Sequence, residues 1–231
     1  GFGKSKKKHQ EETVDIVAFN ADMMKEIFRN SELRYGVEAN VNMVGSKAYN
    51  ENIKTSEITN DVATRYPDDK NRMTTLAAYA SNNWEINKKV IFSQGLRLSN
   101  VSLLASYTPE MLEITQFPYS DDMTQNNTAF NGSLGLVVMP EKGWRLSANL
   151  SSGFRAPNID DVSKLNDSNS SDQLLFVPNP GLKPEYSYNA ELTIEKTFNQ
   201  QVQVGLTGFY TLLDNAFVAR PFLYNGQDSV V

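Results

Sequence analysis

The sequence predicts an all-β fold of antiparallel strands, and three features support this prediction. Apolar and polar residues alternate along several segments, tight turns alternate with long polar links, and large aromatic residues stand beside the tight turns. Successive residues of a strand point to opposite faces, so alternation gives each strand one apolar and one polar face. Short turns at one end of a sheet and long loops at the other are typical of an outer-membrane β-barrel.

Alternation is clearest in four segments, which cover residues 33–43, 144–151, 186–195 and 202–212. Three further segments alternate less regularly and are also expected to be strands, namely 73–84, 89–99 and 129–139. The segment 14–27 fits a strand, although "ADMMKEIF" within it would also suit a short helix. We therefore expect about eight strands.

The connections predict that the long loops all lie at one end of the sheet. Tight turns are expected at 29–32, 85–89, 140–143 and 198–201, and long polar links at 48–72, 102–127 and 154–185. Loops longer than about 12–15 residues are uncommon in compact soluble domains. Four aromatic residues adjoin the turns, namely Phe28, Trp84, Trp144 and Phe198. They fit an aromatic belt at a membrane surface, although aromatic residues also favour strand ends and cores in other β proteins.

The polar faces of the expected strands favour a barrel interior over a soluble sandwich. They carry many Ser, Thr, Asn, Gln and Gly residues, which suit a crowded, hydrated lumen. No apolar run approaches the ~18 residues of a membrane helix, and "GFGKSKKKHQ" at the start lacks the apolar core of a signal peptide. A β-barrel needs no such run, because it crosses the bilayer with alternating strands.

The composition excludes several functional classes. The 231 residues carry a net charge of −5 and no cysteine, which excludes a disulfide scaffold, thiolate zinc sites and a cysteine nucleophile. The one basic run, "KSKKKH" at 4–9, fits a solvated segment, and no basic stripe points to nucleic acid. The sequence has no nucleophile elbow, P-loop or His–Glu metal helix, so we expect no catalytic residues and no enzyme.

Two proline-containing stretches flank the last long link. They are "SSGFRAPNIDDV" at 151–162 and "NPGLKPEYSYNAEL" at 179–192. Proline fixes φ and cannot donate to a strand ladder, so Pro157 should end one strand while Pro180 and Pro184 precede the next. Arg155 and Glu185 would then meet near the loop end as an ion pair, or remain two independently solvated charges.

These stretches resemble the FRAP and NPNL boxes of TonB-dependent outer-membrane receptors. The first box is matched by Phe154, Arg155, Ala156, Pro157 and Asn158, and the second by Asn179, Pro180, Leu182, Lys183, Pro184 and Glu185. Gly181 departs from the Asn or Asp that is common in the second box. The final "FLYNGQDSVV" at 222–231 is similar to members of the family from the Bacteroidetes. The resemblance implies that both boxes are structural and brace the stem of a loop.

The resemblance implies a section of a much larger protein. Family members have a signal peptide, a plug domain and a 22-stranded barrel, so residues 1–231 would be a middle section of that barrel, about strands nine to sixteen, without plug or signal peptide. A complete eight-stranded barrel is the alternative reading of the strand count.

The function that the resemblance implies is energy-coupled uptake through the outer membrane of a Gram-negative cell, with the long loops outside. The ligand would be a ferric siderophore, haem or cobalamin, or an oligosaccharide in some branches. Expected partners are the TonB complex acting through the plug, outer-membrane lipopolysaccharide and, in some systems, a surface lipoprotein; no nucleic acid and no resident cofactor are expected. The alternatives are a soluble β-sandwich adhesin or glycan-binding module, and a passive porin.

The ligand-binding residues are weakly indicated. Haem receptors of this family typically carry a histidine between the two boxes, whereas residues 158–178 contain none and the single histidine is His9. Tyr107, Tyr119, Asp160 and Asp161 are candidates because they lie in expected outer loops, where ordinary loop residues are the competing interpretation. No acidic spacing resembles a calcium loop, so we expect no metal site.

Overall fold

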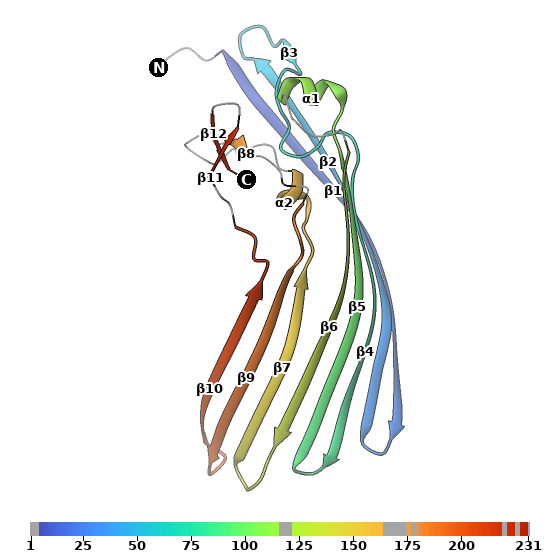
Figure 1. The fold of residues 1–231 in the computed structure, drawn as a ribbon, viewed down its shortest axis with the longest axis vertical. Helices are drawn as coiled ribbons and strands as arrows, with labels where there is room; N and C mark the ends of the chain where they lie inside the picture. Colours follow the sequence, from blue (N-terminus) through green and yellow to red (C-terminus); the bar gives the residue numbers. More distant parts are fainter. Residues whose placement is uncertain are drawn as a thin grey trace.

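The computed structural model describes residues 5–115, 122–163, 175–176, 179, 181–218, 221–224 and 227–230. Its long strands form one antiparallel sheet in the order β1-β2-β4-β5-β6-β7-β9-β10, with short β3 paired to β2 (Figure 1). The strands of this sheet are β1 (Lys6–Phe28), β2 (Ser31–Asn52), β3 (Ile58–Thr59), β4 (Asn71–Asn87), β5 (Val90–Ser106), β6 (Asp122–Val138), β7 (Trp144–Arg155), β9 (Glu185–Phe198) and β10 (Val202–Asp214). The other elements are α1 (Pro109–Thr115), α2 (Ile159–Ser163), β8 (Leu175–Phe176), β11 (Pro221–Tyr224) and β12 (Gln227–Val230).

The strand predictions are confirmed, including the less regular segments. Residues 14–27 belong to β1, which pairs with β2 along its length, so the helical alternative is wrong. The apolar residues of 21–28 had allowed a helix, but their cross-strand partners on β2 decide the conformation. β1 and β2 contain 23 and 22 residues, about twice the length that a strand needs to cross a bilayer.

All four predicted tight turns lie at one end of the sheet, and the long connections lie at the other (Figure 1). The turn after β9 has two successive residues in the left-handed region, Asn199 at φ 50° and Gln200 at φ 59°. Gly143 has φ 81° in the turn between β6 and β7, where a side chain would also collide with the carbonyl of Thr197. Glycine alone adopts that conformation without cost.

The aromatic residues predicted beside the turns do lie at the turn end. Phe28 and Trp84 contact each other edge to face, with ring centroids 5.3 Å apart. Lys196 Nζ lies 4.7 Å from the ring centroid of Trp144 and 5.9 Å from that of Phe198. Such rings combine a large apolar surface with favourable contacts to cations.

The two faces of the sheet differ sharply in polarity. Directly paired residues share a face, and Leu146, Ile194 and Leu206 form one apolar row, in which Leu206 is 76% exposed. The next row, on the opposite face, contains Thr193 and Thr207, whose hydroxyls are 3.0 Å apart. A sandwich would bury the apolar rows under a second sheet, whereas here the large apolar side chains of these rows are exposed.

The polar face carries its own packed charge pair. Arg97 donates to Glu38 and to the hydroxyl of Ser99, each over 3.0 Å. Tyr79, beside Arg97, is paired with Gly36 in the register, and a Cβ on Gly36 would lie 2.7 Å from the Tyr79 hydroxyl. The Tyr79 side chain therefore covers Gly36 and fills the gap that the glycine leaves in the strand.

A small hydrophobic core lies at the loop end of the sheet. Ala105, Tyr107, Met111 and Met123 are buried together. The Thr108 hydroxyl lies 3.3 Å from the backbone N–H of Met111 at the start of α1, while Thr108 itself donates twice to Asp68. The loop 53–70 and helix α1 are thereby packed on the ends of β4, β5 and β6. Within the described part of the chain, no helix is long and apolar enough to span a membrane.

Candidate functional site

The first box forms a sharp corner where β7 ends. Pro157 is fully buried, and α2 begins two residues later. The backbone N–H of Asp161 donates to Asn158 Oδ1 over 3.1 Å, while the backbone N–H of Asn158 donates to Asp161 Oδ2 over 2.9 Å. This reciprocal capping satisfies two donors that the helix start would otherwise leave open. Val162 of α2 is fully buried.

Arg155 joins the two boxes, as one of the two sequence interpretations predicted. Its Nη1 donates to Glu185 Oε2 over 2.8 Å, and the two residues are direct partners in the β7–β9 register. Its Nη2 reaches both carboxylate oxygens of Asp161, at 2.7 and 2.8 Å. The ion-pair prediction is confirmed, and the independently solvated alternative is wrong. Planar guanidinium groups suit such forked contacts to carboxylates.

A third segment reaches the same junction. The backbone N–H of Phe217, which follows β10, donates to Glu185 Oε1 over 2.6 Å. The Phe217 ring lies under the guanidinium of Arg155, with 4.6 Å from Cζ to the ring centroid. Hydrogen bonds from Arg155 and from the Phe217 backbone lower the pKa of Glu185 below its ordinary value. The carboxylate therefore stays ionised at a lower pH than an ordinary glutamate does.

The second box leads into β9 through a local turn. The backbone N–H of Gly181 donates to Asn179 Oδ1 over 2.9 Å, and that of Leu182 to the Asn179 carbonyl over 3.3 Å. Asparagine stabilises such turns with its own side chain. Pro180 lies outside the described residues, and Lys183 and Pro184 lead the chain into β9. The aromatic rings of Phe154, in the first box, and Tyr186, which directly follows the second box, lie 5.5 Å apart.

Helix α2 also contacts the loop between β2 and β4. Tyr66 Oη donates to Asp160 Oδ1 over 2.8 Å, and Arg65 Nη2 lies 3.9 Å from the same oxygen. Burial and this bond to Asp160 raise the pKa of Tyr66. Asp160 thus links the β2–β4 loop to α2. Asp161 links α2 to Arg155, which with Glu185 also holds the segment after β10.

The ligand candidates named from the sequence have different surroundings. Tyr107 belongs to the buried core at the loop end, and burial raises the pKa of its phenol, which disfavours a phenolate ligand there. Asp160 and Asp161 are engaged in the junction, and Tyr119 lies outside the described residues. Sequence reasoning missed Arg65, Tyr66 and Phe217, which no motif marks.

The single histidine, His9, lies on β1, outside both boxes. His9 is on the long β1–β2 hairpin, where Nε2 is 2.8 Å from Glu51 and the ring stacks on Tyr49 at 4.7 Å. No group of three or more His, Cys, Asp or Glu side chains that could hold a metal ion occurs among the residues that the structure describes.

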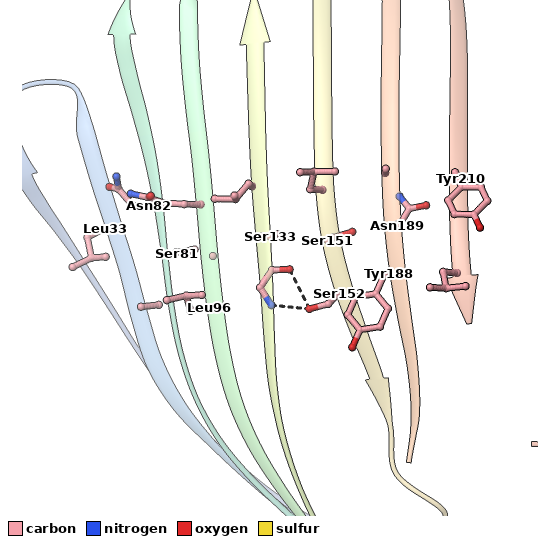
Figure 2. A pocket seen from close by; sticks show the side chains of 18 residues that line it. Leu33, Ser81, Asn82, Leu96, Ser133, Ser151, Ser152, Tyr188, Asn189 and Tyr210 are labelled. Carbon is pink, nitrogen blue, oxygen red and sulfur yellow. Dashed lines mark hydrogen bonds between the residues drawn. The ribbon is translucent and has the colours of Figure 1, made fainter. Parts of the chain in front are cut away.

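An apolar hollow of about 950 Å³ lies midway along the sheet, lined by strands from β2 to β10 (Figure 2). One register row supplies much of its lining, including Leu33, Leu134, Leu150 and Tyr210. Polar contacts are few, one being the bond from the Gly132 N–H to Ser152 Oγ over 3.0 Å. Because most of the large side chains that line it belong to the exposed apolar face, this hollow suits hydrocarbon chains better than a polar ligand.

Comparisons with known proteins agree with this geometry. The family model described as TonB dependent receptor-like, beta-barrel, matches residues 10–229. No curated protein matches the sequence. Among solved structures, the copper transporter OprC gives a TM-score of 0.73 at 16% identity, covering 96% of this chain and 33% of that chain.

Two further solved structures show the same fold. The Serratia marcescens hemophore receptor HasR, in complex with its hemophore HasA and heme, gives a TM-score of 0.65 at 15% identity, covering 97% and 38% of the two chains. The siderophore receptor PirA from Pseudomonas aeruginosa gives 0.63 at 18% identity, covering 95% and 36%. The chain thus spans about a third of the length of these structures. With the family model matching nearly its whole length, the chain belongs to the TonB-dependent receptor-like β-barrel family.

Proposed function

We propose that this chain is part of a TonB-dependent outer-membrane transporter that takes up a scarce ligand such as a ferric siderophore, haem or cobalamin. The observation that carries the proposal is the ion-paired junction of the two boxes, at the loop end of a sheet whose apolar face is exposed. The family match supports this function over a porin, and the exposed apolar face of the large sheet argues against a soluble sandwich.

The proposal includes the setting of the chain in the cell. The long loops would face the outside of a Gram-negative cell, and residues 1–231 would be a section of a 22-stranded barrel. The TonB complex would act through a plug elsewhere in the protein, and lipopolysaccharide would contact the outer wall. A surface lipoprotein partner and an origin in the Bacteroidetes remain predictions from the sequence resemblance.

The ligand class stays open between iron complexes and related cargo. The similar structures are named for copper, for iron, for siderophores and for a hemophore with heme. The sequence between the boxes offers no histidine for haem, and His9 is engaged by Glu51. Tyrosine or methionine can also hold haem iron, so haem belongs in the binding test.

The test uses the purified full-length receptor in detergent, titrated separately with haemin, ferric siderophores, cobalamin and Cu²⁺. We expect saturable binding of one of these probes, and its uptake by cells should stop when TonB is deleted. Uptake that continues without TonB would contradict the proposal and indicate a passive porin. Failure of every probe to bind would contradict the ligand class and point to a glycan or peptide importer.

A further inference from the structure

The loops that follow β7 and β10 are connected at two separate places. At their base, Arg155 and Glu185 hold the segment after β10 through the N–H and the ring of Phe217. Farther out, β8 of the first loop pairs in parallel with β12 of the second, with Leu175 opposite Ser229. Figure 1 shows β8, β11 and β12 grouped together beyond the ends of β7, β9 and β10.

The base contact depends on one side chain. Arg155 makes three charge-assisted hydrogen bonds to two carboxylates and stacks on Phe217. Both carboxylates are more buried than the arginine, with Asp161 16% exposed and Glu185 22% exposed. A network of this kind is worth more than an isolated surface pair, because each partner fixes the geometry of the others. Without Arg155, the two acids would face each other without a cation between them.

We infer that Arg155 is a positioning residue that makes the two outer loops a single ligand-facing unit. The junction of Arg155, Glu185 and Phe217 fixes the direction in which the described parts of both loops leave the sheet, and the β8–β12 pairing holds β8 beside β12. A ligand that contacts β8 or β12 would therefore meet two segments that are already held together, which lowers the entropic cost of binding. The inference extends the proposed uptake function, but its test does not depend on transport.

The chain itself offers a matched control on the same two strands. Arg145 donates to Glu195 over 3.1 Å, and these residues are direct partners in the β7–β9 register, as Arg155 and Glu185 are. This second pair lies toward the turn end, far from both loops. Removing Arg145 would therefore cost a cross-strand ion pair without disturbing the junction of Arg155, Glu185 and Phe217.

The experiment is a cysteine cross-link in the full-length receptor in its membrane. This chain contains no cysteine, and Phe176 and Val230 are direct partners in the β8–β12 pairing. Neighbouring strands are separated by about 4.8 Å, within the Cα range that a disulfide accepts. We expect the double variant Phe176→Cys, Val230→Cys to cross-link on mild oxidation.

Adding Arg155→Ala should lower the cross-linked fraction roughly tenfold or more, because the variant loses all three charge-assisted hydrogen bonds of the junction. Arg155→Lys should restore part of it, because lysine keeps a charge but cannot form the fork. Arg145→Ala should leave it unchanged. The heat-dependent gel shift of the folded barrel should be the same in all variants. Absence of the cross-link with Arg155 present, or an equal yield in Arg155→Ala, would overturn the inference.

Discussion

Glu185 is the residue whose ionisation controls the junction of the boxes. Its pKa is lowered by hydrogen bonds from Arg155 and from the Phe217 backbone. A carboxyl group with a depressed folded-state pKa contributes stability that is fully present above its unfolded pKa, about 4.3. That contribution is lost as the pH falls through the lower, folded-state value.

We therefore expect acid to remove the difference between the native receptor and Glu185→Gln. At neutral pH the variant should be less stable by about 1 kcal/mol, because a charge-assisted contact becomes a neutral one. As the pH falls below the unfolded-state pKa of about 4.3, the difference should shrink, and the two unfolding curves in detergent should converge once the pH lies below the lower folded-state pKa of Glu185. Glu57→Gln, on an exposed part of another loop, is the control. A difference that persists unchanged into strong acid would contradict this role for Glu185.

Among the residues of the junction, Arg155 and Glu185 were predictable from the sequence. The prolines of the two boxes placed Arg155 and Glu185 at adjoining strand ends, which made their pairing predictable. Phe217, Arg65 and Tyr66 were not predictable, because their positions depend on the paths of two other loops. Tyr107 could be assigned to a loop, but only the packing of α1 on β5 shows that it is buried.

At the scale of elements, the turn between β9 and β10 contains a removable strain. Gln200 has φ 59°, a conformation that costs a residue with a side chain roughly 1–2 kcal/mol. Glycine avoids this cost but loses about 0.5–1 kcal/mol through its freer unfolded state. Gln200→Gly should thus stabilise the receptor by about 0.5–1 kcal/mol. Urea unfolding in detergent measures the change, and Gln201→Gly, one residue later and without positive φ, should not stabilise it.

The elements themselves were largely predictable from period-two alternation, because one face of each strand is apolar. The exact extent of β1 and β2 was not predictable. Toward the loop end of the sheet these strands alternate weakly, and there they are held by pairing with each other. The same holds for β8 and β12, which are too short to show any period. Pairing between distant segments, rather than local propensity, creates such strands.

At the scale of the whole molecule, the two faces of the sheet imply opposite surroundings. The exposed apolar rows and the unpaired outer edges of β1 and β10 would drive association in water. In a membrane the same rows would contact lipid, and the Ser- and Thr-rich rows would contact the hydrated lumen. This assignment rests on residues that alternate along one strand, so it can be tested within a single strand.

Leu206 and Thr207 are adjacent on β10 and point to opposite faces. If the apolar face meets lipid, Leu206→Arg should cost about 2–4 kcal/mol near the bilayer centre. Thr207→Arg should cost much less, because its charge would enter the polar face near Glu195, which already pairs with Arg145. The measurement is the free energy of unfolding of the full-length receptor from lipid bilayers. Equal costs at the two positions would mean that both faces meet the same environment, which would exclude the barrel wall as the role of this sheet.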